Sequence, residues 1–186
     1  MDQKCAQAGR VTLGHNTDMR GTELHWVDGP WPGKLALAAR PRGGEWLEDE
    51  ITGWQREGVS TVFSLLEKAE EAELDLAREA AIVKLLGMKF LSFSIADRQV
   101  PPSESRLAAA LEELDADLQS GRNVVLHCRQ GIGRTGLVAA CLLVTKGSDP
   151  QTAIQRLSAA RGVQIPETHE QRSWIEKYAT TLAPHE

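Results

Sequence analysis

The sequence predicts an α/β fold, in which a central mixed or mostly parallel sheet is covered by helices on both faces. Short apolar runs alternate along the chain with segments whose apolar residues recur at helical spacing. The run Val124, Val125, Leu126 is apolar throughout, as a central strand covered on both faces would be. The chain has 186 residues, of which 41% are hydrophobic, so it can bury one sizeable core.

The first predicted elements follow a polar stretch. Residues 1–20 show no periodicity and are expected to form a polar leader, while residues 21–186 are expected to form a single domain. Residues 23–27 and 35–39 are predicted to be short strands, because the prolines and glycines between them would break any helix.

A helix and a buried strand are predicted next. Leu47, Ile51 and Trp54 recur at i, i+4 and i+7, which gives one helix a single apolar face. Gly58 follows where this helix is expected to end. Residues 59–66 form a compact apolar run, which is suited to a buried strand.

The following segment is predicted to be one long helix. Residues 67–86 are rich in Glu, Ala, Leu and Lys and are followed by Gly87, so both propensity and the cap indicate a helix. We expect its charged residues to form a solvated face. Residues 89–95 then place Leu91, Phe93 and Ile95 on one side at a spacing of two, which predicts a strand.

The second half of the chain is predicted to be mainly helical. A helix should follow Ser103, which is a good N-cap, and continue to Gly121. Its leucines fall on one helical face, at Leu107, Leu111, Leu114 and Leu118. Further helices are expected at residues 136–146, 150–160 and 169–182, the second of them opened by Asp149 as its cap.

The charge and cysteine content narrow the possible partners and compartments. The formal net charge is −5, so there is no surplus of positive charge to follow a nucleic-acid backbone or an anionic membrane. No apolar stretch is long enough to span a bilayer. Cys5, Cys128 and Cys141 cannot all pair, which favours a reducing compartment. We therefore expect a cytoplasmic protein with neither a nucleic-acid nor a membrane partner.

Residues 124–136 carry the chemistry, because they run from a strand through a glycine-containing loop into a helix. Such a loop turns several backbone N–H groups inward at the positive end of a helix dipole, which suits a tetrahedral phosphate. Cys128 stands at its entrance, where these N–H groups and Arg134 favour the thiolate. The predicted phosphate-binding loop residues are Arg129, Gln130, Gly131, Ile132, Gly133 and Arg134.

The side chains of this loop predict a nucleophile and its helpers. Cys128 is the expected nucleophile, and Arg134 can give two parallel hydrogen bonds to phosphoryl oxygens. The hydroxyl of Thr135 is expected to donate to the sulfur of Cys128 and assist its departure. His127 is expected to orient the loop rather than to transfer protons.

Cys128, five intervening residues, Arg134 and Thr135, preceded by His127, resemble the signature of the protein tyrosine phosphatase superfamily, in particular its compact dual-specificity-like branch. The resemblance implies a phosphocysteine intermediate and an aspartate that protonates the leaving oxygen. Asp97, 31 positions before Cys128, matches that aspartate, and residues 163–174 resemble a segment in which Gln171 would position water.

The sequence therefore predicts a metal-independent phosphomonoester hydrolase without a cofactor, acting on phosphotyrosine in proteins or peptides, with phosphoserine and phosphothreonine left open. A phosphatase for non-protein esters and an inactive phosphate-binding module are the alternatives. Lipid phosphates are less favoured, because Arg129 is the only additional basic residue in the loop. The five histidines fall at no ligand-like spacing, which argues against metal-dependent chemistry.

A dinucleotide-binding site is a further interpretation of the same loop, since residues 131–136 spell G-x-G-x-x-G between a strand and a helix. That site requires a second parallel strand ending in an acidic residue. Here Asp149 leads directly into another predicted helix, so the βαβ unit is not completed.

Overall fold

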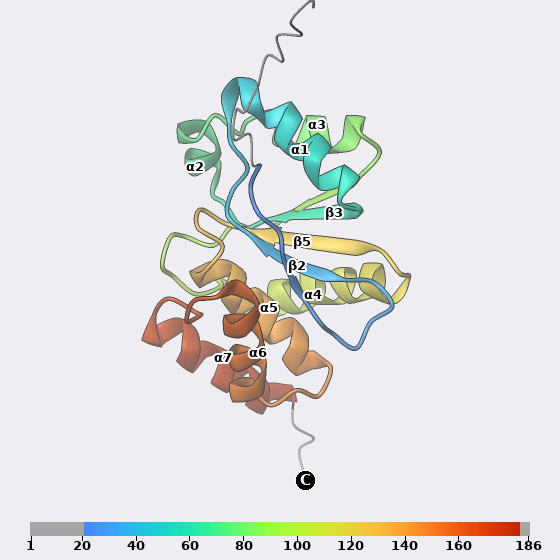
Figure 1. Cartoon of the computed structure of the whole chain (residues 1–186). Coiled ribbons are helices and arrows are strands. Elements are labelled where there is room, and N and C mark those ends of the chain that lie inside the picture. Colours follow the sequence, from blue (N-terminus) through green and yellow to red (C-terminus); the bar gives the residue numbers. More distant parts are fainter. Residues whose placement is uncertain (1–20, 183–186) are drawn as a thin grey trace, which may run out of the picture.

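The computed structural model describes residues 21–182, in which five strands form one sheet (Figure 1). The predicted leader, residues 1–20, lies outside the described residues. The strand order is β1-β2-β5-β3-β4, and every pair is parallel except β1 with β2. The prediction of a mixed, mostly parallel sheet is confirmed. The strands are β1 His25–Val27, β2 Leu35–Ala38, β3 Val59–Ser64, β4 Lys89–Ser92 and β5 Asn123–His127.

Helices cover both faces of the sheet, as predicted. In Figure 1, α1, α2 and α3 lie on one side of the sheet, and α4, α5, α6 and α7 lie on the other. The helices are α1 Leu47–Arg56, α2 Lys68–Glu73, α3 Glu79–Leu85, α4 Glu104–Gln119, α5 Gly133–Thr145, α6 Pro150–Arg161 and α7 His169–Leu182. A short 3-10 turn, Gly44–Trp46, precedes α1.

The central strand β5 contributes to two separate cores. Val124 and Leu126 pack into the core shared with α4, α5, α6 and α7. Val125 points to the opposite face and packs into the core beneath α1 and α3. Because successive side chains of a strand alternate between faces, an apolar run is required here, and all three residues are fully buried.

The prediction of a single helix at residues 67–86 is wrong, because this segment forms two helices, α2 and α3. Asp75 between them adopts a left-handed backbone with φ of 55°, and its carbonyl accepts a hydrogen bond from the N–H of Gly44. Helix propensity is a weak local preference, and here a tertiary contact accompanies the break.

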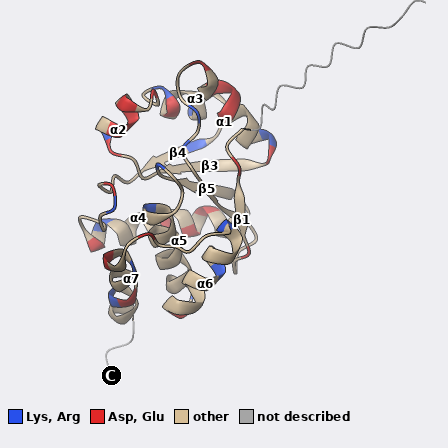
Figure 2. Ribbon diagram, turned by 60° about the vertical axis from the view of Figure 1, so that its left-hand side comes forward, with Lys and Arg blue, Asp and Glu red and all other residues tan. Residues whose placement is uncertain are grey.

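The expectation that the charges of this segment form a solvated face is confirmed only in part, because most of its charged residues are exposed but three carboxylates are not. Acidic residues colour parts of the α1 and α2 ribbons red in Figure 2, and of those in residues 67–86, Glu70, Glu71 and Glu79 are buried. A carboxylate is rarely buried unless it is paired, so these residues point to partners inside the protein.

Most other element boundaries are close to the prediction. Asp149 caps α6 by accepting hydrogen bonds from the N–H groups of Gln151 and Thr152. Helix α5 begins at Gly133 rather than at residue 136, so Arg134 and Thr135 stand in its first turn. None of the helices within residues 21–182 is long and apolar enough to cross a membrane.

The topology places three loops at one edge of the sheet. Strands β3, β4 and β5 are parallel, so the loops that follow them leave from the same edge. The loop after β3 leads into α2, which carries Glu70 in its first turn, while the loops after β4 and β5 carry Asp97 and Cys128. In open α/β sheets, binding sites form at the carboxyl ends of the strands.

Candidate active site

The loop between β5 and α5 is shaped by hydrogen bonds to the outside of its backbone. The guanidinium of Arg161, on α6, donates to the carbonyls of Gln130 at 3.1 Å and Gly131 at 3.3 Å. The carbonyl of Arg129 accepts from the N–H of Arg40 at 3.4 Å. Because these carbonyls are held outward, the N–H groups turn toward the inner side of the loop.

Gly131 occupies a position that tolerates no side chain. Its φ is +68°, in the left-handed region that favours glycine. A Cβ atom there would also lie 2.3 Å from the carbonyl oxygen of Ala38. The tight approach to β2 and the backbone conformation therefore both require glycine.

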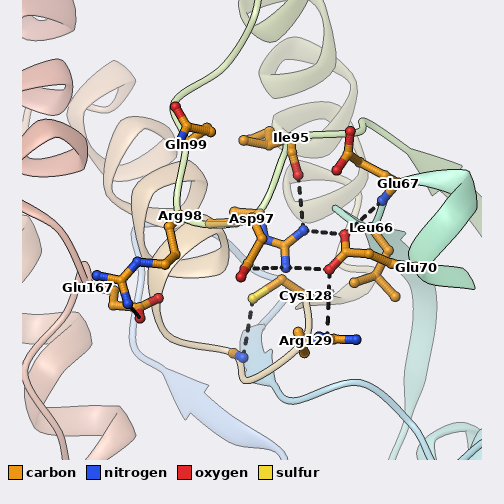
Figure 3. Close-up of polar contacts among 12 residues, drawn as sticks. Leu66, Glu67, Glu70, Ile95, Asp97, Arg98, Gln99, Cys128, Arg129 and Glu167 are labelled. Carbon is orange, nitrogen blue, oxygen red and sulfur yellow. Dashed lines mark hydrogen bonds and ion pairs between the residues drawn. The ribbon is translucent and has the colours of Figure 1, made fainter. Parts of the chain in front are cut away.

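Cys128 lies at the first position of this loop, with 3% of its surface exposed. Its sulfur accepts a hydrogen bond from the N–H of Gly131 at 3.3 Å. Figure 3 shows it facing the side chain of Asp97. A cavity of about 150 Å³ opens here, lined by Asp97, Arg98, Cys128, Arg129, Gln130, Gly133, Arg134 and Glu167. Of the predicted loop residues, Gly131 and Ile132 do not line this cavity.

Arg134 is buried, with 2% of its side chain exposed, and is held by acceptors from two other loops. Its two terminal nitrogens donate to the carboxylate of Glu70, at 2.5 and 2.9 Å, in a bidentate pair. One of them also donates to the carbonyl of Ile95 at 3.0 Å. The plane of the guanidinium is therefore fixed before any ligand binds.

Glu70 is a site residue that the sequence analysis missed. It belongs to a capping box at the start of α2, where it accepts from the backbone N–H of Glu67 at 3.1 Å. The Glu67-x-x-Glu70 spacing was the available signal for a fixed carboxylate. Its partner Arg134, 64 positions away, was not detectable from local sequence.

The pair of Glu70 and Arg134 shifts both ionisation equilibria toward the charged forms. Burial alone would raise the pKa of Glu70, but hydrogen bonds from Arg134 and Glu67 and the charges of Arg134 and Arg129 lower it below its ordinary value. Burial would lower the pKa of Arg134, but Glu70, together with the charges of Cys128 and Asp97, raises it.

Asp97 lies where the resemblance placed the acid, beside the cavity. Its Oδ1 accepts a hydrogen bond from Nη2 of Arg134 at 2.9 Å, and 54% of its side chain is exposed. The structure thus brings Cys128, Arg134 and Asp97, from two loops and a helix start, around one cavity. A carboxylate, a guanidinium and a thiol in this arrangement can bind a phosphate and exchange protons with its ester oxygen.

Gln171 is fully buried. It contacts both the segment before α7 and the loop after β4, residues 95–101, which is called the acid loop below after the role expected of Asp97. Its Nε2 donates to the carbonyl of Gln99 at 3.1 Å, and its Oε1 accepts from the N–H of Thr168 at 3.2 Å. A Cβ atom on Gly133 would lie 3.0 Å from this same Oε1, so the side chain of Gln171 borders the loop between β5 and α5.

The two predicted supporting residues, His127 and Thr135, are both fully buried. His127 is fully buried, with Nε2 2.9 Å from Oε1 of Glu79, an ion-pair distance without hydrogen-bond alignment. Its ring packs near Trp54, with the centroids 5.8 Å apart, so it fits the orienting role. The expected donation from Thr135 is not formed, because its hydroxyl has no hydrogen-bond partner among the described residues.

Arg129 extends the rim on the side of α2. Its Nη2 lies 2.6 Å from Oε1 of Glu73, and its Nε lies 3.9 Å from Oε1 of Glu70. Within residues 21–182, no group of three His, Cys, Asp or Glu side chains gathers as the ligands of a metal ion would.

Comparison with known proteins gives a matching family and several relatives. A family model described as "Polymorphic toxin system, DSP-PTPase phosphatase" matches residues 37–148. The chain is 30% identical over 130 residues to cyclin-dependent kinase inhibitor 3 of Sus scrofa, covering 69% of this chain and 61% of the relative. The human protein of that name is 28% identical over 130 residues, with the same coverage. The chain thus spans about three fifths of the length of these relatives.

Solved structures share the fold. A crystal structure of kinase associated phosphatase, with its catalytic cysteine substituted by serine, has a TM-score of 0.82 at 22% identity, covering 90% of this chain and 99% of that one. PTPMT1 in complex with PI(5)P has a TM-score of 0.68 at 19% identity, covering 84% and 96%.

The Glu70–Arg134 pair predicts that Glu70→Gln destabilises the protein by roughly 1–3 kcal/mol near neutral pH, because a buried guanidinium loses its charged partner. The lowered pKa of Glu70 sets the pH dependence. Its contribution is complete above the ordinary value of 4.5 and is lost as pH falls through the lower folded pKa. The difference in the free energy of unfolding between wild type and Glu70→Gln should therefore become smaller as the pH falls below 4.5.

Urea unfolding of both proteins across this pH range measures the effect. Glu73→Gln is the matched control, since Glu73 is exposed and its pair with Arg129 should contribute less than about 1 kcal/mol. A difference in the free energy of unfolding between wild type and Glu70→Gln that stays constant in acid would contradict the role given to the Glu70–Arg134 pair. An equally large difference for Glu73→Gln would contradict it as well.

Proposed function

The chain belongs to the DSP-PTPase phosphatase family, and from this membership we propose that it is a cysteine-dependent, metal-independent phosphomonoester hydrolase of the dual-specificity type. The observation that carries the proposal is the convergence of Cys128, Arg134 and Asp97 on one small cavity. The mechanism follows from the contacts of these three side chains.

In the first step, the thiolate of Cys128 attacks phosphorus in line with the leaving oxygen. The S–P bond forms while the P–O bond to the leaving group breaks, and Asp97 gives its proton to the departing oxygen. The inward N–H groups of the loop and Arg134 stabilise the charge on the phosphoryl oxygens.

Arg134 has to release one contact for this step. A guanidinium has five N–H donors, and those of Nη1 together with one of Nη2 are taken by Glu70 and Ile95. The remaining donor on Nη2 is bonded to Asp97. A phosphoryl oxygen that binds Nε and Nη2 displaces the carboxylate of Asp97, which takes up a proton from solvent and then, as the carboxylic acid, reaches the leaving oxygen.

In the second step, water attacks the phosphocysteine and the S–P bond breaks. Asp97, now a carboxylate, accepts the proton of the water, and Cys128 leaves as a thiolate. We retain Gln171 as the residue that orients this water. Its Oε1 borders Gly133 of the loop and keeps an acceptor lone pair after bonding to Thr168.

We propose phosphorylated proteins or peptides as the substrates, in a cytoplasmic setting that keeps Cys128 reduced. The cavity is lined only by polar residues, glycine and the cysteine. We therefore expect it to bind the phosphate group rather than the side chain that carries the phosphate. This lining is compatible with phosphotyrosine, phosphoserine and phosphothreonine. It also suits small polar phosphate esters, which makes a non-protein ester the second candidate.

The first test is phosphate release from an aryl phosphate and from phosphotyrosine and phosphothreonine peptides, in excess chelator. Wild type should be active and Cys128→Ser inactive on every substrate that wild type cleaves, since the hydroxyl is a far weaker nucleophile. Activity that disappears with chelator, or that survives in Cys128→Ser, would refute the proposed chemistry. Phosphate binding without turnover would instead indicate an inactive binding module.

Asp97→Ala should lower turnover by a factor of about 10² to 10⁴ near pH 6, because proton donation to the leaving oxygen is lost. The Michaelis constant should not rise, since Asp97 competes with phosphate for Arg134. Asp49→Asn, an exposed carboxylate on α1, is the control and should turn over like wild type. Unchanged turnover in Asp97→Ala would remove Asp97 from the mechanism.

A further inference from the structure

Arg98, which follows Asp97 directly, contacts a distant segment of the chain. Its Nη1 lies 3.1 Å from Oε1 of Glu167, 69 positions away in the segment that leads into α7. Figure 3 shows the two side chains meeting on the side of the acid loop away from Glu70. This ion pair therefore joins the loop after β4 to the loop before α7.

The backbone at Arg98 is strained. Its φ is +60°, in the left-handed region that a residue with a Cβ atom rarely adopts. Such conformations persist only where surrounding contacts enforce them. The ion pair with Glu167 is a contact of this kind at the strained residue itself.

The tip of the acid loop is held mainly by polar contacts. Asp97, Arg98 and Gln99 are all exposed, although Ile95 before them is buried. Their long-range ties are the bonds of Asp97 to Arg134, Arg98 to Glu167 and the Gln99 carbonyl to Gln171. A segment with few apolar contacts and exposed hydrogen bonds opens at low free-energy cost.

We propose that Arg98 and Glu167 form a latch that holds the acid loop over the cavity, so that both are positioning residues for proton transfer by Asp97. This inference rests on the proposed function. Neither residue is assigned the chemistry, and each acts through the position of Asp97.

The latch is needed at the moment when substrate binds. A phosphoryl oxygen on Nη2 of Arg134 displaces Asp97, which removes one of the three ties of the loop. The remaining ties, Arg98–Glu167 and Gln99–Gln171, then keep the loop closed while the carboxyl group of Asp97 turns to the leaving oxygen.

The location of the pair supports this role. Arg98 and Glu167 line the cavity of Cys128 and also a second hollow of about 610 Å³, whose other lining residues are Gln99, Val100, Thr168, His169 and Glu170. The pair therefore lies between the two hollows. Parting of the pair would join the cavity to the larger hollow.

The test compares kcat/KM for aryl phosphates with good and poor leaving groups in Arg98→Asn, Glu167→Gln and the double variant. Asparagine tolerates a left-handed backbone, so Arg98→Asn removes the charge without adding strain. The ratio kcat/KM reports the steps up to formation of the phosphocysteine. A poor leaving group, such as phenolate, needs its proton, whereas 2,4-dinitrophenolate departs without one.

We expect kcat/KM for phenyl phosphate to fall roughly 2- to 5-fold in each single variant, with little change for 2,4-dinitrophenyl phosphate. The modest size reflects an ion pair whose side chains are 63% and 36% exposed. The double variant should be no worse than the more impaired single variant, because the two residues act as a pair. Glu176→Gln, which removes an exposed carboxylate of α7 that lines neither hollow, should behave like wild type.

Three outcomes would overturn the latch. Equal losses for good and poor leaving groups would indicate a merely structural role, and multiplied losses in the double variant would show that the residues act independently. A loss of the same kind in Glu176→Gln would show a general charge effect. A wild-type protein inactive on every ester would refute the proposed function and the latch together, which distinguishes that failure from the other three.

Discussion

The burial of Arg134 is the constraint on which the site depends. A guanidinium removed from water must find an acceptor for its donors, and the acceptors come from Glu70 after β3 and from Ile95 and Asp97 after β4. Arg134 itself follows β5, so one side chain ties together the loops of three parallel strands. The charge that would bind phosphate is thus also the charge that assembles the edge of the sheet.

The cradle around Cys128 depends on tertiary contacts as much as on its own sequence. Arg161, from α6, bonds the carbonyls of Gln130 and Gly131 on the outside of the loop, while the N–H of Gly131 bonds to the sulfur of Cys128 on its inside. The close approach of Gly131 to Ala38 fixes the loop against β2. Helix α6 contributes no side chain to the cavity, but through Arg161 it supports the loop that carries Cys128. Variants of Arg161 are therefore expected to disturb this loop.

Local sequence predicted the strand, loop and helix around Cys128 and Arg134 because glycine positions and apolar periodicity there are short-range signals. Asp97 came from a family resemblance, and the structure brings it to the same cavity. Glu70 and the Arg98–Glu167 pair were missed, since their partners lie 64 and 69 positions away. A contact between residues far apart in the sequence also explains why the prediction of a single helix at residues 67–86 is wrong. Its composition favours a helix, but a turn at Asp75 that bonds to Gly44 ends the first one.

The central claim is that phosphate passes through Cys128. Rapid mixing of enzyme with an aryl phosphate, followed within milliseconds by a denaturing quench and peptide mass spectrometry, tests it most directly. The account predicts a phosphoryl group on the peptide that contains Cys128, on its sulfur, and none on the corresponding peptide of Cys128→Ser. Phosphate released with no phosphorylated enzyme at any quench time, or phosphate found on another residue, would contradict it.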